Sequence, residues 1–209
     1  MKLSSRSFAD GQRIPAEFAF GKPGPDSPCI LSDNRNPQLA WSGAPDGTRS
    51  FVLMCIDTDV PTRGDDVNQA GRTVPHDLPR TDFVHWLMID IPRECGELAA
   101  GSCSDGIVAR GKRDPSGPPG SRQGVNDYTG WFAGDAEMAG DYLGYDGPCP
   151  PWNDERLHHY RFRLYALDVP SLQLHGRFGL AEAQRAMQGH VLAEAELTGI
   201  YSLNPKARG

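Results

Sequence analysis

Three apolar segments of the chain have the length and composition of buried β-strands. Residues 50–56 form a continuous apolar run, with a Gly-Thr pair shortly before it and Asp-Val-Pro shortly after it. Residues 84–89 form a second run that is apolar on both faces. Residues 160–166 alternate at first between apolar and charged positions. We therefore predict three strands that pack in one core.

The rest of the chain predicts weaker strands, one helix and long loops. Weak strand signals occur at residues 3–8 and 38–41, and the alternation of residues 193–201 predicts a closing strand. Residues 180–188 predict the best helix, because they are rich in Ala and Gly189 follows as a stop signal. Gly (24) and Pro (18) are abundant. The predicted fold class is therefore mainly β, with a few short helices and long loops.

Polar side chains stand in register with core residues near the ends of the three strands. Asp57 continues one face of the first strand, and His158 and Tyr160 continue one face of the third. Strict alternation in the second strand puts four residues on one face, namely Phe83, His85, Leu87 and Ile89. Buried ionisable groups are costly without partners, so these groups are expected to satisfy each other or a ligand.

Length and charge narrow the class of protein. A chain of 209 residues suits one domain, predicted to span residues 1–209, as a monomer or a homodimer. A formal net charge of −6 argues against a nucleic-acid partner. No apolar run reaches the length of a transmembrane segment, and the N-terminus lacks the apolar stretch of a secretory signal. A cytoplasmic location is therefore expected.

The five cysteines are expected to be free thiols. Their number is odd, their spacing is wide and no CxxC pair occurs, unlike a zinc ribbon or a disulfide scaffold. Cys95 and Cys103 bracket a Gly-containing loop, which makes them the pair that spacing singles out for a bridge.

Motifs of known chemistry are sparse. The chain has no P-loop sequence, no GxGxxG after a strand and no HExxH, so no cofactor or metal is predicted. Residues 101–106 do not form a nucleophile elbow, because Cys103 takes the middle position and no helix pattern follows. The Gly- and Pro-rich residues 144–151 could form a nest of backbone amides that binds an anion, or an ordinary rigid turn.

These residues in this order resemble the phosphatidylethanolamine-binding protein (PEBP) family. Residues 57–61 (DTDVP) resemble the family's Asp-Pro-Asp-Ala-Pro motif, and residues 85–86 (HW) resemble its His-aromatic strand. Residues 147–151 (GPCPP) and 158–160 (HHY) resemble its Gly-x-x-Pro-Pro…His-Arg-Tyr segment. The resemblance covers nearly the whole chain. It is closest to the bacterial branch often called Raf-kinase-inhibitor-like or YbhB/YbcL-like proteins.

The resemblance implies an antiparallel β-sandwich with small helices at its edges. It also implies a pocket for phosphate-like anions or phosphorylated small ligands, including phospholipid headgroups in some relatives, and a regulatory role is consistent with it. By motif match the ligand-binding residues would be Asp57, Asp59, Pro61, Phe83, His85, Gly147, His158 and Tyr160. No catalytic residue is implied.

Two other hypotheses remain open at this point. Two histidines and a carboxylate also describe a facial-triad metal site or an acid–base pair, so the same cluster could serve a metal-dependent or hydrolytic enzyme. Alternatively, the long loops could contact a protein partner, which the sequence does not identify. The lack of an activated-nucleophile motif favours binding over catalysis.

Three departures from the family pattern bear on the ligand. Residues 62–82 form a longer loop than in many relatives, and residues 131–142 look like an insertion. Both are expected near the pocket mouth, where they would change ligand choice. His159 stands where relatives often carry Arg, which removes a permanent charge.

Overall fold

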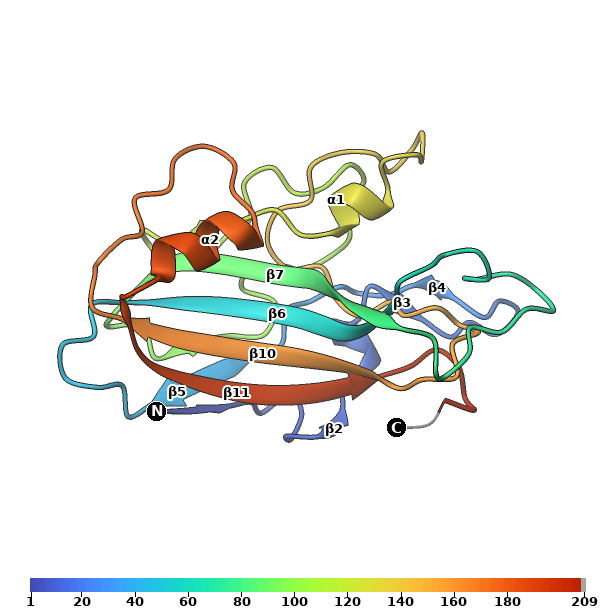
Figure 1. Ribbon diagram of the computed structural model, residues 1–209, viewed down its shortest axis with the longest axis horizontal. Helices are drawn as coiled ribbons and strands as arrows, with labels where there is room; N and C mark the ends of the chain where they lie inside the picture. The colour runs from blue at the N-terminus through green and yellow to red at the C-terminus, as the bar shows by residue number, and fades with distance from the viewer. Residues whose placement is uncertain (208–209) are drawn as a thin grey trace.

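The longest strands form the middle of a six-stranded sheet (Figure 1). The structure is a computed structural model that describes residues 1–207; residues 208–209, part of the range predicted as one domain, lie outside the described residues. The long strands are β6 (Ser50–Pro61), β7 (Arg80–Pro92), β10 (His158–Leu167) and β11 (Val191–Tyr201). The short strands β2 (Gln12–Arg13) and β9 (Arg122–Gln123) complete the order β2-β11-β10-β6-β7-β9. The predicted strands at residues 50–56, 84–89, 160–166 and 193–201 are thereby confirmed.

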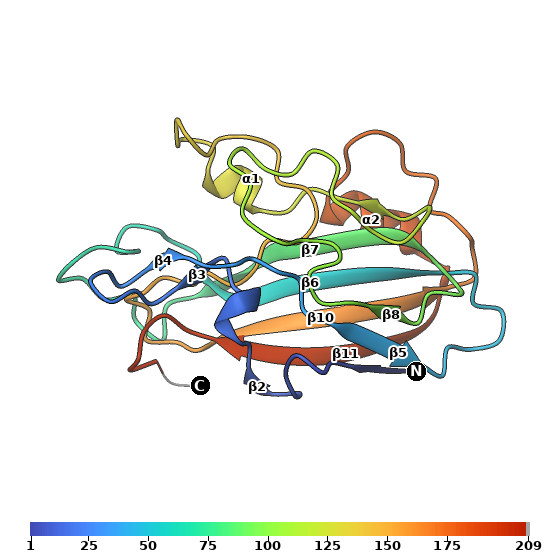
Figure 2. The ribbon, with the colours of Figure 1, turned by 180° about the vertical axis from the view of Figure 1, so that it is seen from behind.

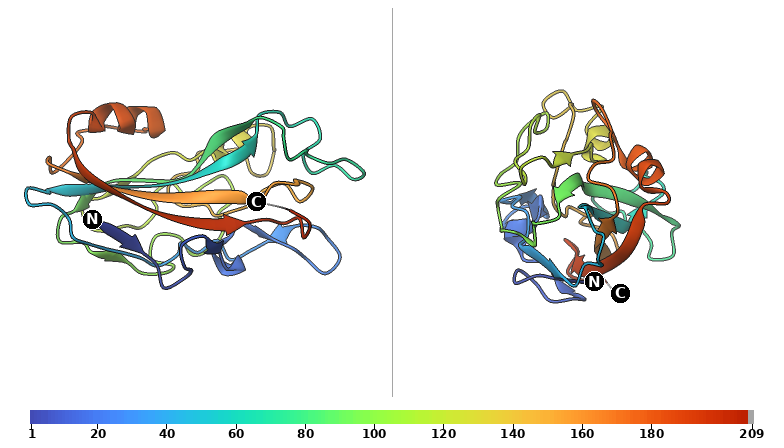
Figure 3. Two further views of the ribbon diagram at one scale, coloured as in Figure 1. Left: turned by 60° about the horizontal axis from the view of Figure 1, so that its bottom comes forward. Right: turned by 90° about the vertical axis from the view of Figure 1, so that its left-hand side faces the viewer.

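A smaller sheet covers one face of the large one. It consists of β1 (Lys2–Ser4), β5 (Leu39–Ser42) and β8 (Glu97–Leu98). The weak strand signals at residues 3–8 and 38–41 correspond to β1 and β5. Leu39 and Trp41 of this sheet pack in one core with Phe51 and Phe162 of the large sheet. The view from the end shows the two layers (Figure 3). The predicted β-sandwich is therefore confirmed.

The opposite face of the large sheet is covered by α2 (Leu180–Met187), the predicted helix (Figure 3). The Glu182 carboxylate accepts the N–H of Gly179, 3.0 Å away, at the start of the helix. Gly189 has a φ of +80°, so the chain can turn after the last residue of the helix. Ala183 and Met187 pack in a second core. Both faces of the central strands are therefore buried.

The remaining elements are short and lie around one end of the sheet. They are the 3₁₀ turn η1 (Ala16–Phe18), the hairpin of β3 (Gly21–Lys22) and β4 (Ile30–Leu31), and the single helical turn α1 (Tyr128–Trp131) (Figure 2). Within residues 1–207, no helix is both long enough and apolar enough to cross a membrane.

A β-bulge in β7 changes which side chains share a face. Cys55 of β6 pairs with Trp86, whereas the next residue, Ile56, pairs with Val84, so His85 is an extra residue without a partner. The prediction that Leu87 and Ile89 share the face of His85 is therefore wrong. Beyond the bulge these two side chains lie in the core under α2. A single inserted residue reverses the positions after it until the next irregularity of the strand, and strict alternation cannot reveal it.

The antiparallel arrangement brings three polar strand ends to one edge of the sheet. β6 ends where β7 and β10 begin. As a result, Asp57 pairs on one side with Phe83 of β7 and on the other with Tyr160 of β10. Side chains of directly paired residues lie on the same face, so this row of three residues defines the start of a site.

Candidate functional site

A cavity of about 400 Å³ opens at this edge of the sheet. Its polar lining comes mainly from the strand ends, with Asp57, His85, His158 and Tyr160. The rest of the lining is almost entirely apolar, and much of it is aromatic: Phe20, Leu31, Val60, Pro61, Gly64, Val67, Phe83, Tyr128, Trp131, Phe132, Cys149, Pro150 and Pro151, with Asn68 as the polar exception. Pockets of this size, with few polar groups among apolar walls, are the usual form of a small-ligand site.

The structure brings together most of the side chains that the sequence singled out. Asp57, Pro61, Phe83, His85, His158 and Tyr160 all line the cavity. Asp59 and Gly147 do not, and both serve to support the walls, as described below. Residues 64, 67 and 68 from the loop 62–82 and residues 131 and 132 from the segment 131–142 also line it. The two long segments are therefore part of the pocket.

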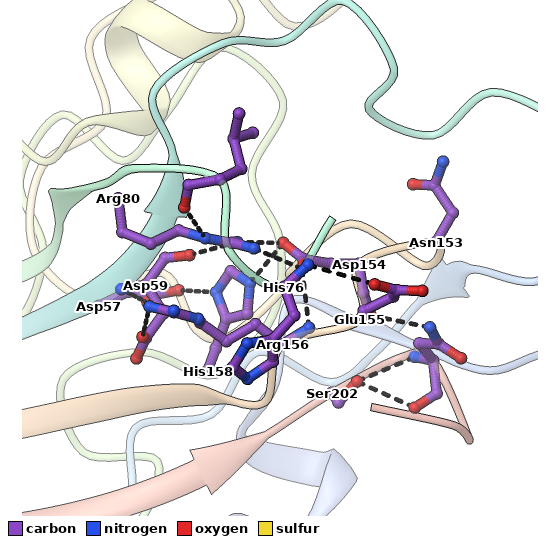
Figure 4. Close-up of polar contacts among 12 residues, drawn as sticks. Asp57, Asp59, His76, Arg80, Asn153, Asp154, Glu155, Arg156, His158 and Ser202 are labelled. Atoms are coloured by element: carbon purple, nitrogen blue, oxygen red, sulfur yellow. Dashed lines mark hydrogen bonds and ion pairs between the residues drawn. The ribbon is translucent and has the colours of Figure 1, made fainter. Parts of the chain in front are cut away.

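His158 lies between two buried carboxylates (Figure 4). Its Nδ1 is 2.7 Å from Oδ2 of Asp57, and its Nε2 is 3.1 Å from Oδ2 of Asp154. Asp154 is also paired with Arg80, whose Nη2 lies 3.0 Å from Oδ1. Asp57 uses its other oxygen to accept the N–H of Asp59 at 2.9 Å. Both ring nitrogens of His158 are thus occupied, and neither is free to bind a ligand.

Burial and charge act against each other in this cluster, and charge prevails. Burial alone would lower the pKa of His158, but Asp57 and Asp154 raise it to about 9. Burial likewise opposes ionisation of Asp57, but the His158 imidazolium outweighs it and lowers the pKa of that carboxyl. The same balance lowers the pKa of Asp154, with His158 and Arg80 as its partners. His158 is therefore protonated at neutral pH, and its positive charge stabilises the buried carboxylates of Asp57 and Asp154.

His85 has the opposite protonation behaviour. Its Nδ1 lies 2.7 Å from the carbonyl oxygen of Asp146 and must therefore carry a proton to donate to it. Burial lowers the pKa of His85 below its ordinary value despite the nearby carboxylates Asp57, Asp127 and Asp146. At neutral pH the ring is thus uncharged. Within residues 1–207 its Nε2 makes no hydrogen bond, so it presents a lone pair in the cavity lining.

Asp146 holds His85 in place through a second buried network. Its carboxylate accepts hydrogen bonds from Asn34 and Asn126, each at 2.8 Å, and pairs with Lys112 at 2.7 Å. The N–H of Asp146 donates to the carbonyl oxygen of His85 at 3.0 Å. Asp146 was not predicted from the sequence, because the family motif singled out the neighbouring Gly147 instead.

The Tyr160 hydroxyl is a buried donor without a partner. The residue is fully buried, and its hydroxyl makes no hydrogen bond with any group in residues 1–207. Burial raises the pKa of Tyr160 well above its usual value, with the charge of Asp57 adding to the effect, so the hydroxyl keeps its proton. Its ring contacts that of His85 edge to face, with centroids 5.1 Å apart. An unsatisfied buried donor in a cavity indicates a group that accepts its hydrogen bond when bound.

Stacked aromatic rings form a wall of the cavity beside the polar groups. Phe20 stacks on Tyr128 with ring centroids 4.6 Å apart, and Tyr128 stacks on Phe132 at 5.6 Å. Phe83 meets Tyr128 edge to face at 5.2 Å. Trp131 is 54% exposed, whereas Tyr128 is buried. Phe83 comes from β7, whereas the other rings come from loops and from the single turn α1, where no periodicity marks them in the sequence.

Gly147 is required by the backbone rather than by a ligand. A Cβ at this position would lie 2.1 Å from the carbonyl oxygen of Phe18. Its N–H donates to Oδ1 of Asn34 at 2.8 Å. Pro148, Pro150 and Pro151 have no N–H to offer. Of the two alternatives for residues 144–151, the rigid turn fits better than the nest of backbone amides, because most of the donors of a nest are missing or already used.

Asp59 binds the chain around the start of β10 and does not line the cavity. Its Oδ2 accepts hydrogen bonds from the N–H of His159 at 3.0 Å and from Nδ1 of that ring at 2.9 Å. Its Oδ1 lies 3.4 Å from Nη1 of Arg156. A permanent cation is thus present beside Asp59 although His159 itself is not an arginine. Asp59 fixes the start of β10, on which His158 and Tyr160 lie.

Two further expectations concern cysteines and metals. Within residues 1–207 all five cysteines are free, and the closest sulfur pair is Cys29 and Cys149, with Sγ atoms 3.8 Å apart. Spacing had singled out Cys95 and Cys103 instead. No group of three or more His, Cys, Asp or Glu side chains in the described part of the chain is arranged to hold a metal ion.

Fold and cavity together define a β-sandwich protein with a largely apolar cavity at the end of its large sheet. A model of the phosphatidylethanolamine-binding protein family matches residues 4–202. The chain therefore belongs to the phosphatidylethanolamine-binding protein family.

Relatives and solved structures agree with this assignment. A UPF0098 protein of the archaeon Methanothermobacter thermautotrophicus is 31% identical over 96% of this chain and 98% of its own. The UPF0098 protein YbhB of Escherichia coli is 29% identical over 97% of this chain and 100% of its own. The crystal structure of Escherichia coli YbcL, described as a member of the mammalian PEBP family, matches with a TM-score of 0.67 and 25% identity, over 96% of this chain and 97% of that one. The YbhB/YbcL-like resemblance is thus confirmed, although relatives also include archaeal proteins.

Proposed function

We propose that this protein binds a phosphate-like anion or a phosphorylated small ligand in the cavity lined by Asp57, His85, His158 and Tyr160. The observation that carries the proposal is the buried, unpartnered hydroxyl of Tyr160 beside the free Nε2 of His85. One group donates a hydrogen bond and the other accepts one. A phosphate monoanion, with both P–O⁻ and P–OH groups, complements this pair.

The protonation of His85 sets the form of the ligand. A neutral Nε2 accepts a hydrogen bond, so it pairs with the P–OH of a monoanion. With a dianion, the ring must take up a proton first, against the burial that lowers the pKa of His85. The result is the same by either route. The complex carries one proton more than the free phosphate dianion and the free protein with a neutral His85 carry together.

His158 acts indirectly in this proposal. Both its nitrogens are held by carboxylates, so its charge compensates Asp57 and Asp154 and keeps the ligand-facing wall close to neutral. The same occupancy argues against the hydrolytic alternative, because a general base needs a nitrogen that can reach the substrate.

The aromatic wall favours a ligand with an apolar part. Four aromatic side chains line the cavity beside the polar groups, namely Phe20, Phe83, Tyr128 and Phe132, and the rings of Phe83 and Tyr128 contact that of His85. Burial of apolar ligand surface against these rings contributes roughly 25 cal/mol per Å². Phenyl phosphate is accordingly expected to bind more tightly than inorganic phosphate.

Calorimetry with phenyl phosphate tests the proposal. Tyr160→Phe and His85→Gln should each weaken binding at least about tenfold, since each removes a hydrogen bond to a charged group. Tyr165→Phe is the matched control for the first variant, because Tyr165 lies on the same strand but packs in the core under α2. Tyr160→Phe should melt no lower than the unmodified protein, because its hydroxyl has no partner to lose.

Two outcomes would contradict the proposal. If both variants bind phenyl phosphate as tightly as the unmodified protein, the ligand site lies elsewhere. If binding is lost after chelation and restored by a stoichiometric metal, the His/Asp cluster serves a metal instead of an anion.

A further inference from the structure

Two cysteines join separate walls of the pocket. The Sγ atoms of Cys29 and Cys149 are 3.8 Å apart, although the residues are 120 positions apart in the sequence. Cys149 lines the cavity, and so does Leu31, two residues after Cys29. Cys29 immediately precedes β4 of the β3–β4 hairpin, whereas Cys149 belongs to the Pro-rich segment 147–151.

The backbone holds these two segments together without the sulfurs. The N–H groups of Phe20 and Gly21 both donate to the carbonyl oxygen of Pro148, at 2.9 and 3.1 Å. Gly21 pairs in turn with Leu31 across the hairpin. The approach of the two thiols is therefore fixed by main-chain hydrogen bonds on both sides.

Gly21 provides the space in which the sulfurs meet. A Cβ at this position would lie 2.5 Å from Sγ of Cys149 and 2.8 Å from Sγ of Cys29. Both distances are shorter than a side chain can adopt, so the two sulfurs occupy the volume that any larger residue would need. The absence of a side chain at Gly21 of β3 therefore leaves room for the two thiols to be in contact.

The two thiols differ in the way that an attacking and a resolving cysteine differ. Cys29 is partly exposed, and its hydrogen bond with Cys149 lowers the pKa of Cys29 to about 7, so much of it is thiolate at neutral pH. The same hydrogen bond and burial raise the pKa of Cys149 well above its usual value. Attack on a dissolved disulfide would therefore start at Cys29.

We propose that Cys29 and Cys149 are a redox modification site, at which a reversible disulfide joins the β3–β4 hairpin to segment 147–151. The oxidant is a low-molecular-weight disulfide, RSSR. The Cys29 thiolate attacks one sulfur, forms a mixed disulfide and releases RS⁻. The Cys149 thiol then loses its proton and attacks Sγ of Cys29, which releases the second RS⁻. Both cysteines are oxidised by one electron each, and RSSR is reduced to two RS⁻. The proton of Cys149 and the proton that Cys29 released to water when it ionised convert the two RS⁻ to two RSH.

The bond would act on the pocket through its walls. A disulfide requires the sulfurs to approach from 3.8 Å to about 2 Å, which draws the hairpin and segment 147–151 together. Leu31, Cys149 and Pro150 line the cavity on these two segments. Oxidation would therefore restrict the movement of two walls at once. This inference needs no ligand in the pocket.

A glutathione titration of the full-length protein tests the proposal. After equilibration at increasing ratios of oxidised to reduced glutathione, acid quenching and denaturation, the thiol count should fall from five to three. Peptide mass spectrometry should then find Cys29 linked to Cys149. Cys149→Ser should instead trap glutathione on Cys29, and Cys95→Ser, the matched control, should still lose two thiols.

Hydrogen exchange reports on the walls directly. The amides of residues 20–31 should exchange more slowly in the oxidised protein than in the reduced protein. A count of five thiols at the most oxidising ratio, or a bridge that includes Cys95 or Cys103, would overturn the modification site. Unchanged exchange in protein shown to carry the Cys29–Cys149 bond would overturn its effect on the walls. All of these readouts are independent of phosphate binding, so they fail or succeed separately from the proposed function.

Discussion

Nδ1 of His158 lies 2.7 Å from Oδ2 of Asp57, and the side chains of both residues are almost completely buried. On its other side the imidazolium meets Asp154, which is itself held by Arg80. Charges removed from water require compensation, and here each charge depends on the next. The polar end of the pocket is therefore rigid and sensitive to the loss of a single member.

Removal of the central cation should be strongly destabilising. His158→Gln leaves the buried carboxylate of Asp57 without its cation, and a broken buried pair of this kind costs about 3–5 kcal/mol. Urea denaturation measures the loss. The matched control is His190→Gln, because His190 pairs with Asp168 at a similar distance, 2.8 Å, but on the surface. That change should cost less than about 1 kcal/mol. Equal losses in the two variants would contradict the role assigned to His158.

Stability should depend on pH on both the acid and the alkaline side. The pKa of His158 is raised in the folded state to about 9, so its contribution is complete below its unfolded value of about 6.5 and is lost as the pH rises through about 9. The pKa values of Asp57 and Asp154 are lowered, so their contribution is present above about pH 4 and is lost as the pH falls.

Denaturation midpoints measured across this pH range test the assignment. His158→Gln should abolish the decline between about pH 6.5 and 9, because the titrating group is gone. A decline of the same size in the variant would mean that another group causes it.

Anion choice should follow protonation. Phosphate can bring a P–OH to the neutral Nε2 of His85, whereas sulfate at neutral pH has only acceptors. Phosphate should therefore bind more tightly than sulfate at pH 7. The affinity for a phosphomonoester should fall by up to about tenfold per pH unit above its second pKa of about 6, since one proton enters the complex. Calorimetry with inorganic phosphate and with sulfate at pH 7 measures the first effect, and calorimetry with phenyl phosphate from pH 5.5 to 8.5 measures the second. Equal affinities, or affinity independent of pH, would contradict the donor–acceptor arrangement of Tyr160 and His85.

Gly147 should tolerate no side chain. In Gly147→Ala the new Cβ would meet the carbonyl oxygen of Phe18 at 2.1 Å, so the backbone must shift, at a cost of about 1–3 kcal/mol. Gly134→Ala is the control, because no atom lies within 4 Å of a Cβ at that position. Thermal unfolding followed by circular dichroism compares the two. A variant at position 147 as stable as the control would show that the approach to Phe18 is not required.

The sequence predicted the fold well because its long strands carry clear apolar patterns. Continuous apolar runs identify β6 and β7, alternation identifies β10 and β11, and the two-residue period of a strand places Asp57 and Tyr160 each on the face of core residues. The bulge at His85 could not be predicted, because a bulge is set by the pairing of two strands rather than by one segment. For this reason the prediction that Leu87 and Ile89 share the face of His85 was wrong.

Residues in loops were the hardest to predict. Asp154, Arg80 and Asp146 organise the charges of the site, yet each owes its position to contacts across long stretches of chain. Phe20 and Tyr128 face each other in the pocket from segments 108 residues apart, with no pattern that links them. Strand register singled out the four polar residues of the cavity, and the resemblance to the family added the other members of the expected ligand-binding set.

The pocket lining also has a consequence for folding kinetics. Its walls come from β6, β7, β10, the β3–β4 hairpin, α1 and segment 147–151, which are spread over most of the chain. Each wall must close a long loop before it meets its neighbours, so no early, locally folded fragment contains the cavity. During refolding, a bound phenyl phosphate would therefore report only on a late step, when residues 20–31 have met residues 149–160 across the cavity.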